Sequence, residues 1–401
     1  MLNRKFLALA GSSVLVHAFL FATSGMYGRV APFNDVLLYG WWLFEMQGGP
    51  ILGVSADWVY PYPALIPIFV ATALGGGVNI LLGWVTMMAI LNTLLIGQIT
   101  DWGRGQSKAF VAAWFWLGFL FLLGPVAIGR IDAVATAIAG FGLVAFSNGK
   151  IRQAVTFFTL GAWVKIWPIA TALGLFLSSN LKKNLLLTAS IAVSAVLALG
   201  LLLGGDLSLF SFVSTQGNRG IQIESPIATI WLWAAKLGTV GAGIYFDDVL
   251  LTNQVSGPGV AEVAALMTPA MAVAIAITAL LGWRAARAGA DSSQVFAIVS
   301  LTAVLDLIVF NKVGSPQFIG WLAVPIIAVI IFQLQGWRVA MVGGLGLAAL
   351  TYLIYPLYYL DLMGLGWLSI GLLTVRNLGL ILLLVWANLK LGSLAKPQAV
   401  R

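Results

Sequence analysis

The chain has 401 residues, of which 61% are hydrophobic and 8% are charged, and its formal net charge is +8. The mean hydropathy of +1.00 and repeated apolar runs exclude a soluble globular fold and predict an all-α polytopic membrane protein. The lack of cysteine excludes disulfides, thiol chemistry and thiolate metal sites. Basic residues are scattered one or two per loop without an interleaved aromatic patch, so no nucleic-acid partner is expected.

Apolar runs predict a bundle of about 12 transmembrane helices, following the ~20-residue length that a bilayer requires. The first run follows Arg4 and Lys5, and we interpret it as a helix because no small-x-small cleavage pattern of a signal peptide follows it. The spans are expected at residues 6–26, 79–98, 109–123, 132–147, 154–164, 167–179, 184–203, 263–282, 293–311, 316–333, 339–355 and 372–391.

Two of these runs, 154–164 and 167–179, are too short to cross a ~30 Å hydrocarbon core alone. The break between them, from Lys165 to Pro168, predicts two short helices that meet at one face of the membrane. A single long helix is the alternative, and it would invert the sidedness of every later loop.

The charges predict how the chain is oriented. With the N-terminus in the cytoplasm, the inner loops hold most of the lysines and arginines and, of the acids, only Asp101 and Asp291. This positive-inside pattern predicts a multi-pass protein of the plasma membrane with both termini in the cytoplasm. The short apolar segment 64–75 is expected to lie in the membrane interface, because counting it as a span reverses the downstream charge bias.

Two large loops then face outward, at residues 27–78 and 204–262, and they place the function on the non-cytoplasmic side of a single domain spanning 1–401. The first loop carries Asn34, Asp35 and Tyr39. A carboxylate beside membrane helices is costly unless it lines a wet cavity or a site, so Asp35 is a candidate general base. A solvated loop acid or a helix N-cap is the alternative.

Further along the first loop, Tyr60 and Tyr62 alternate with prolines. Their rings can pack on the C–H faces of a sugar, although an aromatic belt at the membrane interface gives the same pattern. Asp132 is a second acid at the outer start of a helix, where it could equally complement the helix dipole. The loop with Gln222, Glu224 and Ser225 is interpreted as substrate-facing, with an ordinary turn as the alternative.

Basic residues recur singly at or near the predicted outer helix ends. If several converge on one cavity, they would bind a phosphate, whereas each alone could extend to the lipid headgroups. The phosphate role is favoured for Lys165, which lies at the break between two short helices. The residues concerned are Arg130, Lys165, Arg219, Lys312 and Arg376.

The order of these motifs resembles polytopic GT-C glycosyltransferases, and most closely the polyprenol-phosphate-mannose-dependent mannosyltransferases of glycosyltransferase family 87. The first outer loop carries the matches Asp35-Val36-x-x-Tyr39, Gly48-Gly49-Pro50 and Tyr60-Pro61-Tyr62-Pro63. Shorter matches are Lys165 to Pro168, Arg219-Gly220-x-Gln222-x-Glu224-Ser225 and Ser315-Pro316-Gln317-Phe318. Together they extend from about residue 30 to about residue 380.

The resemblance implies an inverting transfer of a hexose, expected to be mannose, from a polyprenyl-phosphate sugar to a lipid-linked or glycolipid hydroxyl. Asp35 would be the general base, and Lys165, Arg219, Arg376 and Lys312 would neutralise the phosphate of the departing lipid. The expected sugar or acceptor contacts are Asn34, Tyr39, Tyr60, Tyr62, Arg130, Asp132, Gln222, Glu224, Ser225 and Gln317. Membrane lipids surround such a protein.

The chain departs from the family in two ways. The family's Gln-x-Asn near the second outer loop is replaced by Gly129-Arg130-Ile131-Asp132, and no histidine lies on the predicted outer face. No cofactor is expected. Two acids could ligate a divalent ion, but their separation on different loops makes a metal-free site the prediction.

Two other classes of protein fit the composition. A polytopic transporter or lipid flippase would distribute charged residues through the middle of the membrane helices. A non-catalytic subunit of a cell-envelope complex would not depend on Asp35. The sequence contains no HExxH, Walker or GxSxG motif, which disfavours a protease, an ATPase or a serine hydrolase.

Overall fold

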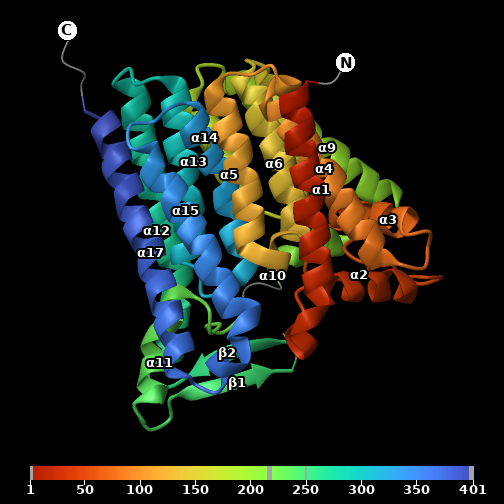
Figure 1. Cartoon of the computed structure of the whole chain (residues 1–401), viewed down its shortest axis with the longest axis vertical. Helices are drawn as coiled ribbons and strands as arrows, with labels where there is room; N and C mark the ends of the chain where they lie inside the picture. The colour runs from red at the N-terminus through yellow and green to blue at the C-terminus, as the bar shows by residue number, and fades with distance from the viewer. Residues whose placement is uncertain (1–2, 215–218, 249–250, 397–401) are drawn as a thin grey trace. The chain divides into compact units, whose positions relative to one another are not determined.

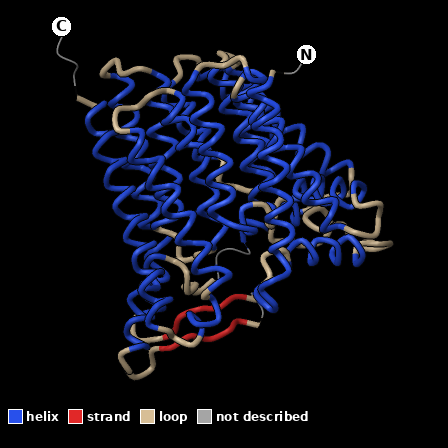
Figure 2. Tube along the Cα trace, viewed as in Figure 1, coloured by secondary structure: helices blue, strands red, loops and turns tan. Residues whose placement is uncertain are grey.

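The computed structural model describes residues 3–214, 219–248 and 251–396. The chain divides into two compact units, the first made of residues 1–172 and 179–218 and the second of residues 173–178 and 219–401. Regular structure in both units is almost entirely helical (Figures 1 and 2). The predicted all-α polytopic membrane architecture is confirmed at this level, whereas the single-domain prediction stays a prediction.

The first unit contains the N-terminal helices and the first predicted outer loop. Its α-helices are α1 (Arg4–Ser24), α2 (Asn34–Glu45), α3 (Leu65–Leu74), α4 (Ile80–Ile99), α5 (Ser107–Leu123), α6 (Ile131–Ser147), α7 (Ile151–Val164), α9 (Lys182–Leu202) and α10 (Ser211–Ser214). Short 3₁₀ segments connect them at Gly25–Val30, Tyr62–Ala64, Asp101–Gly103, Gly124–Ala127 and Leu207–Phe210. Helix α8 (Ile169–Ser178) is divided between the units.

The second unit contains the remaining helices and the only strands in the part of the chain that is described. Its α-helices are α11 (Thr229–Lys236), α12 (Val260–Arg287), α13 (Ser292–Val309), α14 (Ala323–Ile331), α15 (Trp337–Tyr352), α16 (Tyr359–Met363) and α17 (Trp367–Leu394). Two 3₁₀ segments, Pro226–Ala228 and Pro316–Leu322, and one π-helical segment, Leu353–Leu357, complete it. The strands are β1 (Gly243–Asp247) and β2 (Thr252–Ser256).

Eight helices among the described residues are long and apolar enough to cross a membrane. They are α1, α4, α5, α9, α12, α13, α15 and α17 with their short extensions. The other predicted spans correspond to shorter helices: α6, α7, α8 and the segment Pro316–Ile331. The number of 12 spans therefore stays a prediction, but the chain has the architecture of a multi-pass membrane protein.

The predicted break in the middle of the chain is present. Helix α7 ends at Val164, Lys165 has extended backbone angles, and α8 begins at Ile169. Pro168 explains the break, because proline lacks the N–H that a continuous helix needs there and disfavours the helical conformation of the residue before it. The alternative of one long helix over 154–179 is wrong.

Side-chain contacts show which segments lie at each end of the helix bundle in the first unit. At one end, the rings of Phe6 and Trp102 lie 5.1 Å apart, and the ammonium group of Lys5 lies 5.3 Å from the ring of Phe110. At the other end, the indole nitrogen of Trp84 donates to the carbonyl of Ile128 over 2.6 Å. The start of α1 and the predicted inner loop between α4 and α5 therefore lie at one end of these helices, and the first outer loop lies at the other.

Helix α2 runs crosswise to α1 (Figure 1), and α3 packs on α4. Gly83 permits the packing of α3 on α4, because a Cβ at this position would collide with the backbone carbonyl of Ala71. The opposite side of α3 exposes Ile66 and Phe69. A helix is thus present where an interfacial one is predicted, and its place in the membrane interface stays a prediction.

The sequence analysis did not predict the hairpin of β1 and β2, nor the short helices α10, α11 and α16. Ile244 pairs with Val255 in the antiparallel register of the hairpin, and both side chains contact the buried cluster that contains Trp231 and Leu232. Aromatic and β-branched residues favour strands, and here one face of the hairpin is buried against α11.

Candidate active site

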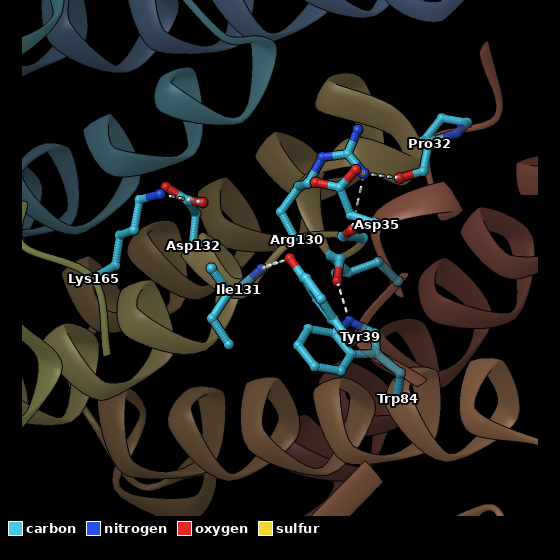
Figure 3. A network of polar contacts seen from close by, with 10 residues as sticks. Pro32, Asp35, Tyr39, Trp84, Arg130, Ile131, Asp132 and Lys165 are labelled. Atoms are coloured by element: carbon cyan, nitrogen blue, oxygen red, sulfur yellow. Dashed lines mark hydrogen bonds and ion pairs between the residues drawn. The ribbon is translucent and has the colours of Figure 1, made fainter. Parts of the chain in front are cut away.

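Four charged side chains from three segments of the first unit meet where α6 begins (Figure 3). We call Asp35, Arg130, Asp132 and Lys165 the α6 charge cluster. Asp35 is the second residue of α2, Arg130 and Asp132 flank the first residue of α6, and Lys165 follows the last residue of α7. The sequence analysis named them as separate candidates on three segments, and the structure brings them together.

Arg130 joins the first outer loop to α6. Its Nη1 lies 3.0 Å from Oδ1 of Asp35 and donates to the carbonyl oxygen of Pro32 over 2.6 Å. The arginine is buried, whereas the side chain of Asp35 remains 35% exposed. The guanidinium therefore fixes one carboxylate oxygen while the carboxylate stays accessible to another molecule.

Asp132 and Lys165 form a second, looser ion pair, with 3.7 Å between Oδ2 and Nζ. Asp132 is almost fully buried and lies in the first turn of α6, where its charge also complements the helix dipole. Lys165 is 17% exposed, and its ammonium lies 4.5 Å from the centroid of the Tyr60 ring. The lysine is thus held by a carboxylate and by an aromatic face, which attracts cations.

Four rings contact one another beside Lys165, and we call Tyr39, Trp42, Trp58 and Tyr60 the aromatic cluster. The Tyr60 centroid lies 6.4 Å from that of Tyr39, 6.2 Å from Trp42 and 5.2 Å from Trp58, with the ring planes close to perpendicular. Edge-to-face contacts of this kind hold aromatic side chains in fixed orientations. The Tyr60 face beneath Lys165 is therefore occupied by the ammonium in this structure.

Tyr39 is fully buried, and its hydroxyl accepts a hydrogen bond of 3.1 Å from the backbone N–H of Ile131. This contact satisfies one of the free N–H groups at the start of α6. Burial raises the pKa of the Tyr60 phenol, and the negative charges of Asp35 and Asp132 raise it further. Burial likewise raises the pKa of Tyr39 well above its ordinary value, so both phenols stay protonated at neutral pH.

Gly129 allows the chain before α6 to approach the first loop closely. A Cβ at this position would collide with the ring of Phe33 and lie 2.9 Å from the carbonyl oxygen of Pro32. That same carbonyl accepts from Arg130. The glycine is thus needed for the approach that pairs Arg130 with Asp35.

The other first-loop candidates lie near the cluster in sequence but have different surroundings. Asn34 is exposed at the start of α2. Tyr62 is buried with Val54 and Leu209, and its hydroxyl donates to the carbonyl of Val196 over 2.6 Å. Tyr62 therefore anchors α9 in this structure, and it exposes no ring face for a sugar.

In the second unit, five candidates lie in or beside one buried segment, Ile221–Ser225. The side chains of Gln222, Glu224 and Ser225 are buried, and Arg376 donates from Nη2 to the backbone carbonyl of Glu224. Lys312 contributes its carbonyl, which accepts from the N–H of Gln222 over 3.0 Å. Close packing continues at Gly314, where a Cβ would collide with the backbone of Ser225.

Two further candidates lie at the edges of this region: Arg219 precedes the segment and is half-buried, and Gln317 lies half-buried in the 3₁₀ segment Pro316–Leu322. The prediction that Arg376 lies at an outer helix end is wrong. Helix α17 begins at Trp367 rather than near residue 372, because Trp367, Leu368 and Ile370 extend its apolar run, so Arg376 lies inside the helix and is buried.

Sequence reasoning missed some members of the first-unit site. The carbonyl of Pro32 carries no side-chain signal, and the contact of Trp84 with Ile128 joins residues far apart in the chain. Trp42 could have been found, since it lies on α2 one helical turn after Tyr39, at the spacing that places two side chains on one face.

Within the described ranges, no group of three or more His, Cys, Asp or Glu side chains could hold a metal ion. No protein-family model, no curated protein and no solved structure matches this chain. The fold defines the class, a helical multi-pass membrane protein.

Proposed function

We propose that the protein is a membrane glycosyltransferase that moves a hexose, expected to be mannose, from a polyprenyl-phosphate sugar to a hydroxyl of a lipid or glycolipid. The reaction takes place on the non-cytoplasmic side of the plasma membrane. The observation that carries the proposal is the α6 charge cluster, in which an accessible carboxylate and a partly exposed lysine lie beside the aromatic cluster at one end of the helix bundle.

Asp35 is suited to act as the general base. It removes the proton of the acceptor hydroxyl as that oxygen attacks the anomeric carbon, the bond from this carbon to the phosphate oxygen breaks, and the configuration inverts. Arg130 holds the carboxylate by one oxygen, which leaves the other oxygen to accept the proton. The polyprenyl phosphate leaves as an anion and needs charge stabilisation rather than protonation.

Lys165 is suited to stabilise that anion. Its ammonium has three donors and is held by Asp132 at the long distance of 3.7 Å, so a phosphate can approach it without breaking a tight ion pair. Arg219, Lys312 and Arg376 belong to the other compact unit. Their predicted part in the same phosphate site remains a proposal.

Reconstituted protein tests the proposed function. Wild-type protein in phospholipid vesicles, given a radiolabelled polyprenyl-phosphate hexose and a lipid extract, should transfer the label to a lipid. The new linkage should have the anomeric configuration opposite to that of the donor. Lack of transfer from any polyprenyl-phosphate hexose tested, or retention of configuration, would contradict the proposal.

Transport of a lipid or a small solute is the second candidate, favoured by one observation. Arg376 and Asp306 are both buried within candidate membrane spans, and Asp306 accepts a hydrogen bond of 2.6 Å from Thr278. Intramembrane ionisable residues are frequent in transport pathways. A transporter would move the labelled lipid across the vesicle membrane without forming a new glycosidic bond, so chemical analysis of the product separates the two functions.

A further inference from the structure

We propose that α11 and the segment before it form a re-entrant element that lies in the membrane, with α11 facing lipid acyl chains, rather than part of an aqueous outer loop. The partner of this surface is the hydrocarbon and headgroup region of the bilayer. The inference concerns only the second unit and does not depend on the proposed function.

Helix α11 lies along the outer turns of α17, antiparallel to it. Asn377 donates to the hydroxyl of Thr229 over 2.8 Å, and the indole nitrogen of Trp233 donates to the hydroxyl of Thr374 over 2.9 Å. At the far end of α11, the ammonium of Lys236 lies 4.7 Å from the ring centroid of Trp367. The partners of Thr229 and Lys236 on α17 are ten residues apart, about 15 Å along its axis, and Thr229 itself lies about 10 Å further along α11 than Lys236 does.

The contacts between α11 and α17 determine how deep α11 lies in the membrane. Helix α17 has 28 residues and is about 42 Å long, which exceeds the ~30 Å hydrocarbon core. A Trp beside a Lys at a helix end is typical of the headgroup region, so Trp367 and Lys236 mark the membrane boundary. Thr229, paired with Asn377, then lies at hydrocarbon depth.

The surfaces of α11 fit this position. Trp231 and Leu232 are buried against the hairpin and α17, whereas Ile230 is 60% exposed and Leu237 is 71% exposed. The neighbouring surface of α17 is apolar and exposed as well, with Leu368, Val375, Leu378 and Leu382. The apolar side of α11 thus continues the surface by which α17 would face lipid.

The segment that leads into α11 also meets the requirement for irregular backbone at membrane depth, which is tolerated only where its polar groups are satisfied within the protein. The N–H groups of Gln222 and Ile223 donate to the carbonyls of Lys312 and Asn253, and the carbonyl of Ile221 accepts from Val255. The carbonyl of Glu224 accepts from Arg376. This accounts for a buried arginine inside a membrane helix.

Spin-label depth measurements test the proposal, since the chain has no cysteine and single-cysteine variants need no background mutations. Ile230→Cys and Leu237→Cys would be labelled in vesicles of phosphatidylcholine and phosphatidylglycerol. The controls are Leu382→Cys, on the lipid-facing side of α17, and Ser292→Cys, at the exposed start of α13. Collision rates with oxygen and with a water-soluble nickel complex would be compared.

The proposal predicts that the oxygen-to-nickel collision ratio at position 230 equals that at position 382. Both ratios should be several-fold above the ratio at position 292. Position 237 should fall between the two controls. A ratio at position 230 equal to that at position 292 would overturn the proposal, and so would a ratio at position 237 above that at position 230.

Discussion

Two buried arginines, Arg130 and Arg376, show how one residue type serves two purposes in this chain. Arg130 lies at a helix start and pairs with the carboxylate of Asp35, which stays partly exposed. Arg376 lies inside α17, and its hydrogen bond to the carbonyl of Glu224 ties down irregular backbone. Arg130 also donates to a backbone carbonyl, that of Pro32, so the difference lies in the partly exposed carboxylate beside it. A charge beside such a carboxylate can take part in chemistry, whereas a charge buried inside a helix against irregular backbone maintains the fold. The two regions should therefore respond differently to mutation.

The largest effect is expected in the first region. Asp35→Asn should lower hexose transfer by about 10²- to 10⁴-fold, the usual contribution of a general base, because the amide cannot accept the hydroxyl proton. The melting temperature should change little, since the amide oxygen can still accept from Arg130. Asp57→Asn, at an exposed acid of the same loop, is the control and should remain active. Full activity of Asp35→Asn would remove the proposed base.

In the second region, around Arg376, mutation should lower the stability of the protein. Arg376→Ala leaves the carbonyl of Glu224 without its donor and should lower the free energy of unfolding by about 2–3 kcal/mol. Arg338→Ala, at an exposed arginine, is the control and should stay within about 0.5 kcal/mol of wild type. Thermal unfolding in detergent measures both. An Arg376→Ala variant as stable as Arg338→Ala would mean that this arginine does not hold the segment.

Lys165→Ala should weaken use of the sugar donor more than use of the acceptor. Loss of one charge-assisted contact to phosphate should raise the donor KM by about 10- to 100-fold. Lys236→Ala removes another lysine that lies over an aromatic ring and should leave the donor KM unchanged. Equal changes in the donor and acceptor KM values would argue against a phosphate contact at Lys165.

The smallest effect is expected from Gly129→Ala. The added methyl group would collide with Phe33, and displacing this ring should cost about 1–2 kcal/mol of stability. Because Pro32 and Arg130 would move apart, transfer activity should fall as well. Gly346→Ala, on α15 with open space around it, is the control and should stabilise the protein by about 0.5 kcal/mol. Equal melting temperatures for the two variants would contradict the close approach at Gly129.

The sequence predicted the features that local patterns encode. Hydropathy predicted the membrane class, and Pro168 together with short apolar runs predicted the break at Lys165. The sequence analysis also named all four members of the α6 charge cluster, but as separate candidates. The pairing of Asp35 with Arg130 depends on how two distant segments pack through Phe33 and Gly129, and periodicity carries no such information.

The misjudged features have physical reasons too. The first turns of α17 contain Ser369 and Gly371, which weaken the helix signal, so Arg376 was placed too near the helix end. The hairpin lies in a polar loop where short strands give little signal, and burial of Ile244 and Val255 against α11 stabilises it. Tertiary packing therefore determined both the start of α17 and the formation of the hairpin.

The most direct test of the account concerns the two ends of the first-unit bundle. Asn34→Cys, beside the catalytic candidate, and Gln106→Cys, in the loop between α4 and α5, both place a thiol at an exposed position. A membrane-impermeant maleimide applied to intact cells should label position 34, and it should label position 106 only after the membrane is permeabilised. Labelling of position 106 in intact cells, with position 34 protected, would place the α6 charge cluster in the cytoplasm and contradict the account.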